Sequence, residues 1–133
     1  MKNGTIEVLG IKVPIKITGE QIKTYGIDST YMTIGGVSSV IRQSIKHLKS
    51  IGEICYEKLW VRSESYSGGN SVKVYLMSAN ESTMNIVESL MNGFEYGNFD
   101  PMIDLYNYKE VQNHLKFNDG SKIECSTKYG FVN

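Results

Sequence analysis

The sequence predicts an α+β domain of two layers, an antiparallel sheet with two main helices on one of its faces. Apolar residues recur at helical spacing in two segments, which predicts two amphipathic helices. Other segments alternate apolar and polar residues around turn-forming residues, which predicts hairpins. The elements follow the order ββ-α-ββ-α-ββ, and packing both helices on one side of a sheet buries both sets of apolar residues. The 133 residues are expected to form one domain, 1–133.

The chain is predicted to begin with a β-hairpin. Thr5–Leu9 and Ile11–Thr18 alternate apolar and polar residues on either side of Gly10. Pro14 has no backbone N–H to donate, which favours an edge position for its strand. A looser segment, Gly19–Gly36, leads to the first helix.

The first helix is predicted over Val37–Ile51, and Gly52 is placed to end it. Apolar residues at helical spacing form one stripe along this segment. Cations at positions i, i+4 and i+7 lie on the opposite, solvent-facing side. The apolar stripe consists of Val37, Val40, Ile41, Ile45 and Leu48, and the basic stripe consists of Arg42, Lys46 and Lys49.

A central hairpin is predicted from two alternating strands, Lys58–Ser63 and Ser71–Met77, joined by the turn cluster Glu64–Asn70. One face of this hairpin is apolar, with Leu59, Val61, Val72, Val74 and Leu76. The other face combines cations with aromatic rings, and Tyr66 is expected at its tip. This outward face consists of Lys58, Trp60, Arg62, Lys73 and Tyr75.

The second helix is expected to start near Ser78, because Ser78 and Glu81 have the spacing of a capping box. Gly93 is placed to end it. An acidic-aromatic segment, Glu95–Tyr108, follows, and Asn118-Asp-Gly120 in the tail is a strong hairpin signal. The apolar side of the helix carries Met84, Val87, Leu90, Met91 and Phe94.

The overall charge excludes a strong field that would steer the whole chain to nucleic acid, because 14 basic and 14 acidic residues cancel. The charges are unevenly distributed, basic from Val37 to Tyr75 and acidic from Leu76 to His114, which is compatible with a dipolar surface, with head-to-tail self-association as in a homodimer, or with plain solvation. The N-terminus lacks the apolar core of a signal peptide and no apolar run is long enough to span a membrane, so we expect a cytoplasmic chain with no membrane partner. Cys55 and Cys125 are expected to be free thiols in or near the core.

Three segments occur in a distinctive order: IRQSIK (Ile41–Lys46), LWVRSESYSGGNSVKVYL (Leu59–Leu76) and FEYGNFDPMIDLYNY (Phe94–Tyr108). Together they resemble the large polyvalent protein associated domain of type twenty-nine, a family of phage and mobile-element proteins. The likeness covers residues 37–129 and leaves out the hairpin of residues 1–18. The resemblance implies a role in the contest between mobile elements and their hosts, in the host cytoplasm, and supplies no catalytic residue.

Four groups of residues are candidate binding sites. The outward hairpin face suits nucleic acid, because rings stack on bases and cations neutralise phosphates; alternatively its rings are covered by the N-terminal hairpin or a dimer mate. The start of the first helix can present backbone N–H groups to an anion, or can be only a turn and a cap. The basic stripe can bind phosphates or an acidic protein surface, or simply be solvated. The anion candidate comprises Gly35, Gly36, Ser38 and Ser39.

The fourth group is the acidic-aromatic segment, which can mimic nucleic acid, dock on a basic groove of a protein, or cover the core as a lid. Its members are Glu95, Tyr96, Phe99, Asp100, Asp104, Tyr106 and Tyr108.

We expect no catalysis, no metal and no cofactor. His47 and His114 are isolated in the sequence, and the cysteines have no partner spacing for a metal site. Asp100 and Asp104 have the character of paired carboxylates, but nothing else in the sequence indicates a hydrolase.

Three hypotheses of function follow. The leading one, from the resemblance, is a non-enzymatic protein that inhibits a host defence complex, such as a CRISPR effector ribonucleoprotein, by binding it. The first alternative is a module that binds DNA or RNA through the basic-aromatic hairpin face. The second alternative is a protein that sequesters a small nucleotide signal.

Overall fold

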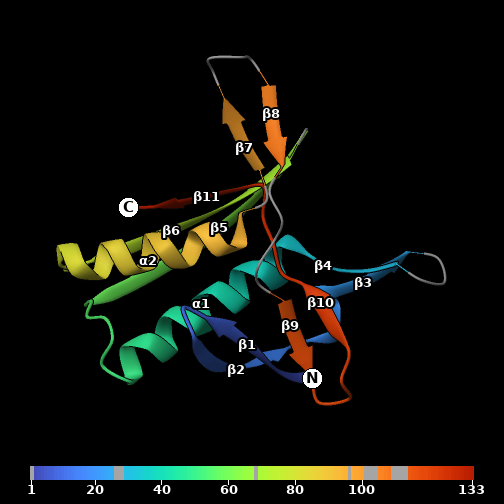
Figure 1. The fold of residues 1–133 in the computed structure, drawn as a ribbon, viewed down its shortest axis with the longest axis horizontal. Helices are drawn as coiled ribbons and strands as arrows, with labels where there is room; N and C mark the ends of the chain where they lie inside the picture. Colours follow the sequence, from blue (N-terminus) through green and yellow to red (C-terminus); the bar gives the residue numbers. More distant parts are fainter. Residues whose placement is uncertain (1, 26–28, 68, 96, 101–104, 109–113) are drawn as a thin grey trace.

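The computed structural model describes residues 2–25, 29–67, 69–95, 97–100, 105–108 and 114–133, with side chains for 2–23, 31–67, 69–95 and 114–133. The fold is α+β, as the sequence predicts, and the described residues form two helices and several small sheets (Figure 1). The elements are β1 (Lys2–Val8), β2 (Ile11–Ile17), the 3-10 turn η1 (Gly19–Gln21), β3 (Ile22–Tyr25), β4 (Ser29–Met32), α1 (Ile34–Ser50), β5 (Lys58–Tyr66), β6 (Gly69–Met77), α2 (Glu81–Phe94), β7 (Gly97–Asp100), β8 (Leu105–Tyr108), β9 (His114–Phe117), β10 (Lys122–Glu124) and β11 (Tyr129–Val132).

The strands do not form the single antiparallel sheet that the sequence predicts. A four-stranded sheet has the order β10-β9-β1-β2, and a three-stranded sheet has the order β11-β6-β5. Two further hairpins, β3-β4 and β7-β8, pair only with themselves in the described chain. Strand β11 runs parallel to β6, so the second sheet is mixed. The N-terminal hairpin is confirmed, and β2, which contains Pro14, is an edge strand as predicted.

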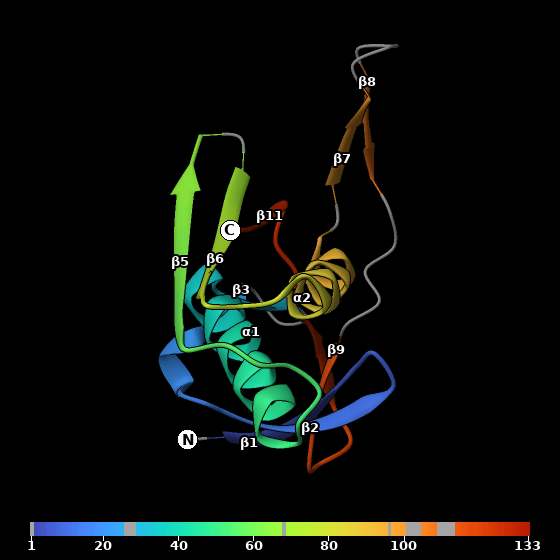
Figure 2. The ribbon, with the colours of Figure 1, turned by 90° about the vertical axis from the view of Figure 1, so that its left-hand side faces the viewer.

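Helix α1 lies between the two larger sheets (Figure 2). The predicted apolar stripe is fully buried, but Ser38 and Ser44 on its flanks are buried as well. A helix that packs on one sheet usually hides a narrower stripe. The wide buried arc of α1 is therefore the consequence of packing against β2 on one side and β5 on the other.

Two polar side chains on the flanks of α1 attach it to the open edge of each sheet. The side-chain amide of Gln43 accepts from the backbone N–H of Lys16 at 2.9 Å and donates to the Lys16 carbonyl at 2.8 Å, so it substitutes for a missing neighbour of β2. On the other side, Arg42 Nη2 donates to the carbonyl of Val61 in β5 at 3.1 Å. Each bond satisfies backbone groups that an edge strand leaves unpaired.

The ends of several elements differ from the predicted ones. Helix α1 starts at Ile34, three residues before the predicted Val37, because Thr33 caps it by accepting from the Gly36 N–H at 3.1 Å. Helix α2 starts at Glu81 and is capped by Asn80, whose Oδ1 accepts from the N–H of Thr83 at 2.8 Å. The predicted capping box at Ser78 is wrong, since Ser78 has a φ of 61° outside the helix. The predicted helix terminator Gly93 lies within α2.

The predicted tail hairpin is confirmed as β9 and β10. Asp119 fixes its turn, because Oδ1 accepts from both the N–H and the hydroxyl of Ser121. These hydrogen bonds lower the pKa of the Asp119 carboxyl. Gly120 has a φ of +90°, which glycine adopts without strain.

The two cysteines have different environments, and both are free thiols. Cys125 is buried next to the sulfur of Met32, at 3.6 Å, and burial raises the pKa of its thiol. Cys55 is exposed, so the prediction that it lies in or near the core is wrong.

Candidate binding surface

The three-stranded sheet has one apolar face and one aromatic, cationic face. The inner side chains of β5 and β6, such as Val61, Val72 and Val74, are buried. Helices α1 and α2 pack against this sheet, α1 on β5 and β6 and α2 on β11. The opposite side, here called the outer face, contains four of the large hydrophobic side chains that are exposed in the described chain. These are Trp60, Tyr66, Met77 and Phe131.

The register of β5 and β6 brings together the residues that the sequence predicts. Trp60 pairs with Tyr75, and Arg62 pairs with Lys73 in the next row of the same face. Trp60 remains 45% exposed, so the ring is available to a partner. Lys58 lies at one end of the face. The strands extend further into the turn cluster than predicted, and Tyr66 occupies the far end, opposite Gly69.

Strand β11 adds a third row of side chains that the sequence reasoning missed. Phe131 aligns with Lys73 and Tyr129 aligns with Ser71, so both aromatic residues lie on the outer face. The ammonium of Lys73 is 5.9 Å from the centroid of the Phe131 ring, and the Tyr129 and Phe131 rings stack with centroids 6.5 Å apart. The alternation Tyr129-Gly130-Phe131 was the available signal for this strand.

Polar side chains fix β11 in this position. Asn70 Oδ1 accepts from the N–H of Lys128 at 2.8 Å and from the hydroxyl of Thr127 at 3.0 Å, at the start of the strand. On the free edge of β11, the Glu95 carboxylate accepts from the N–H of Gly130 at 2.6 Å. Glu95, predicted as part of the acidic-aromatic site, therefore supports the backbone that carries Phe131.

A hollow of about 330 Å³ lies on the outer face between Trp60, Arg62 and Tyr75. A ring, a guanidinium plane and a second ring thus surround one small space. This arrangement can hold a flat aromatic group by stacking, with the cation beside it for a phosphate. The alternative that the N-terminal hairpin covers Trp60 and Tyr75 is wrong, because β2 packs on α1, on the apolar side of the three-stranded sheet. The alternative that a dimer mate covers them stays a prediction.

The basic stripe of α1 is exposed, and its three cations have different contacts. Arg42 is tied to β5 as described above. The ammonium of Lys49 lies 4.3 Å from the centroid of the Tyr56 ring. Lys46 and Lys49 line a separate hollow of about 510 Å³ with Tyr56 and Leu59. Burial raises the pKa of the Tyr56 hydroxyl.

The anion candidate at the start of α1 lies inside the helix and is engaged in packing. The N–H groups of Gly36 and Val37 already donate to the side chain and the carbonyl of Thr33. Ser38 donates to the Gly35 carbonyl, and Ser39 accepts from Gln43. The backbone groups that an anion needs at Gly36 and Val37 are therefore used within the fold.

Within the acidic-aromatic segment, the described strands β7 and β8 pair antiparallel and project from the rest of the molecule in both views (Figures 1 and 2). Of its predicted site residues, Tyr96 and Asp104 lie outside the described residues. The strands include Phe99, Asp100, Tyr106 and Tyr108, whose side chains lie outside the described ones.

Among the described residues, no three His, Cys, Asp or Glu side chains are grouped so that they can hold a metal ion. No helix in the described part of the chain is long and apolar enough to cross a membrane. Comparison of the chain with protein-family models, curated proteins and solved structures finds no match, so the resemblance to the large polyvalent protein associated domain stays a prediction.

Proposed function

We propose that the chain is a non-catalytic binding protein that holds single-stranded nucleic acid on the outer face of the β11-β6-β5 sheet. The observation that carries this proposal is the arrangement of exposed rings and cations on one uncovered sheet face. Trp60 lies on one edge strand and Phe131 on the other, so their strands are two spacings, roughly 10 Å, apart across the sheet, and Phe131 lies one row further along it. Arg62 and Lys73 lie in the row between the Trp60–Tyr75 pair and the far end of the sheet.

The chemistry of the face favours single strands over duplexes. Splayed bases stack on aromatic rings and on guanidinium planes, whereas the bases of a duplex are hidden in its stack. Lys58, Arg62 and Lys73 outnumber Glu64 on the face, so the local charge is positive although the chain as a whole is neutral. Binding is therefore expected to weaken with salt.

Trp60, the only tryptophan, makes a direct test available. We expect fluorescently labelled twelve-nucleotide RNA or DNA to bind and to quench the Trp60 emission, while a matched duplex binds more weakly. Phe131→Ala and Tyr75→Ala should each weaken binding about tenfold, because stacking contributes roughly 1–3 kcal/mol per base. Arg62→Gln should lower the slope of log K against log salt by about 1.

Tyr31→Ala is the matched control, because Tyr31 is an exposed aromatic residue on β4, away from the outer face. Its affinity should equal that of the unchanged protein. Absence of quenching, or equal losses in Tyr31→Ala and Phe131→Ala, would contradict the proposal.

A second candidate is a protein that inhibits a host defence complex, such as a CRISPR effector, by docking on it. The specific observation in its favour is the projecting β7-β8 hairpin, whose strands contain Phe99, Asp100, Tyr106 and Tyr108. In a bacterial lysate, the tagged chain should then retain one defence complex. Changing Phe99 and Tyr106 together to alanine should abolish that retention and leave nucleic-acid binding unchanged. Retention unaffected by this double change would exclude the hairpin as the docking element.

A further inference from the structure

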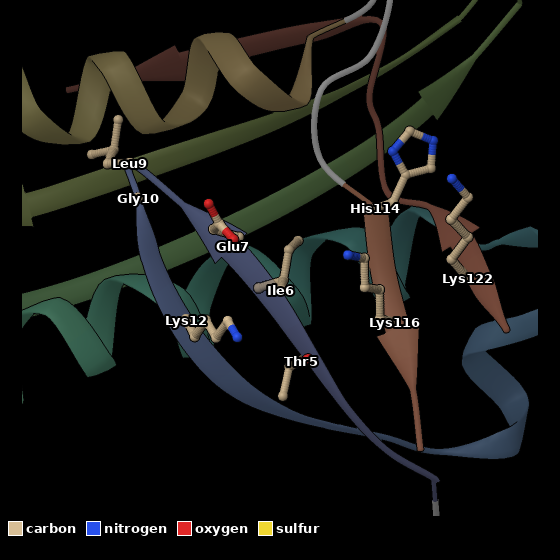
Figure 3. A pocket seen from close by; sticks show the side chains of 9 residues that line it. All are labelled: Thr5, Ile6, Glu7, Leu9, Gly10, Lys12, His114, Lys116 and Lys122. Carbon is tan, nitrogen blue, oxygen red and sulfur yellow. The ribbon is translucent and has the colours of Figure 1, made fainter. Parts of the chain in front are cut away.

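A second concave surface lies on the exposed face of the four-stranded sheet. The proposed nucleic-acid surface lies on the other sheet, β11-β6-β5. It is a cavity of about 540 Å³ between the β1-β2 hairpin and the strands β9 and β10 (Figure 3). This volume falls within the range typical of small-ligand sites, about 300–1,000 Å³. Its lining includes Lys12, Lys116, Lys122 and His114, with Glu7 as the one carboxylate among the described lining residues.

The register of β9 and β10 places two of these lysines directly opposite each other. Lys116 pairs with Lys122 on adjacent antiparallel strands, and Thr5 of β1 lies on the other side of Lys116 in the same row. Like charges at directly opposed positions destabilise a sheet. Within the described residues, neither lysine forms an ion pair. An anion bound between the two ammonium groups would remove this repulsion.

The remaining side chains indicate what else the anion carries. Lys12 approaches the same space from β2, and His114 approaches it from β9, above Lys116 (Figure 3). Leu9 lies at the rim on the hairpin turn, half exposed, with a φ of 51° that a branched side chain rarely adopts. Cations on both sides of the cavity, with an apolar rim at the hairpin turn, suit a ligand with a multiply charged group and a less polar body.

We propose that this cavity binds a small phosphorylated ligand of the nucleoside di- or triphosphate class. The ammonium groups of Lys116 and Lys122 contact the phosphates from one side of the cavity and that of Lys12 from the other. The Thr5 hydroxyl and His114 supply further donors, and Leu9 packs on the base. Glu7, opposite Lys12 in the register, accepts from a ribose hydroxyl. This site is separate from the outer face of the three-stranded sheet and does not depend on the function proposed for it.

Calorimetry with pyrophosphate, ATP and adenosine tests the site in the full chain. Pyrophosphate and ATP should bind, ATP more tightly because of the apolar rim, and adenosine should bind weakly or not at all. Changing Lys116 and Lys122 together to glutamine should weaken ATP and pyrophosphate binding about tenfold or more, because charge-assisted hydrogen bonds to phosphate are lost. Lys16→Gln is a control that removes one lysine charge from the same sheet, outside the cavity lining, and should leave the affinity unchanged.

Thermal unfolding gives a second readout that a simple loss of folding cannot imitate. Without ligand, the Lys116→Gln, Lys122→Gln double variant should melt at the same or a higher temperature than the unchanged protein, because the repulsion is gone. With millimolar pyrophosphate, only the unchanged protein and Lys16→Gln should gain melting temperature.

Three results would overturn the proposal. One is the absence of pyrophosphate and ATP binding. Another is equal weakening by Lys16→Gln, which would mean non-specific attraction. The third has two parts: the unchanged protein does not bind pyrophosphate, and the double variant loses affinity for single-stranded RNA. That result would show that these lysines bind nucleic acid instead.

Discussion

Replacing Phe94 with alanine is expected to lower the free energy of unfolding by about 3–5 kcal/mol, the usual cost of removing a buried aromatic ring. Phe94 is fully buried at the end of α2 and is the largest of the fully buried side chains in the described chain. Its carbonyl also accepts from the N–H of Thr127 at 2.8 Å, just before β11. The cavity left by the ring would therefore lie where α2 meets the strand that completes the outer face.

Urea unfolding monitored by circular dichroism measures this effect. The matched control is Phe131→Ala, which deletes the same ring from a site that is 47% exposed. Its cost should be about 1 kcal/mol or less, because a surface substitution leaves no cavity. Similar losses for the two variants would show that Phe94 is not in the core. If the fold around β11 loosens first, Phe94→Ala should also weaken binding on the outer face at urea concentrations well below the unfolding midpoint.

The adjacent glycines of α1 are expected to respond to alanine with opposite signs. Alanine normally favours a helix over glycine by about 1 kcal/mol. At Gly35 a new Cβ would have only the Thr33 hydroxyl within 4 Å, at 3.9 Å, so Gly35→Ala should raise stability by about 0.5–1 kcal/mol. At Gly36 a Cβ would lie 2.8 Å from the backbone carbonyl oxygen of Gln21 and 2.7 Å from Met32 Cγ.

Gly36→Ala should therefore destabilise the protein by about 2–3 kcal/mol, the upper part of the usual cost of overpacking. The Met32 side chain can rotate away, but the Gln21 oxygen also accepts from Thr33 N, so the backbone there is held in place. The melting temperatures of the two variants should lie on either side of that of the unchanged protein. A shift of the same sign for both would mean that the start of α1 does not pack on η1 and β4.

The sequence predicted the central hairpin well because both of its strands alternate. Alternation decides which residues share a face, and a short turn cluster keeps neighbouring segments in register. Trp60, Tyr75, Arg62 and Lys73 could therefore be assigned to one surface from the sequence. In the same way, the Asn118-Asp-Gly120 turn predicts the β9-β10 hairpin. The register of this hairpin places Lys116 opposite Lys122.

Long-range pairing could not be predicted in this way. Strand β11 lies beside β6, more than fifty residues earlier in the chain, and the side chains of Asn70 and Glu95 and packing on α2 help to hold it there. Two parallel strands are not joined by a short turn, so no local sequence signal indicates that they pair. For the same reason the sequence predicts one sheet, whereas β1 pairs with β2 and β9, and neither β1 nor β2 joins β5 and β6.

By itself, the sequence determined the α+β class, the two amphipathic helices and the aromatic, cationic side of the central hairpin. These properties follow from periodicity and turn chemistry, which act over a few residues. Only the tertiary structure decided that α1 separates two sheets and that Phe131 completes the outer face. It also decided that Lys12 faces the cavity lined by Lys116 and Lys122. These features join residues far apart in the chain, where packing and edge-strand hydrogen bonds, rather than local pattern, select the neighbours.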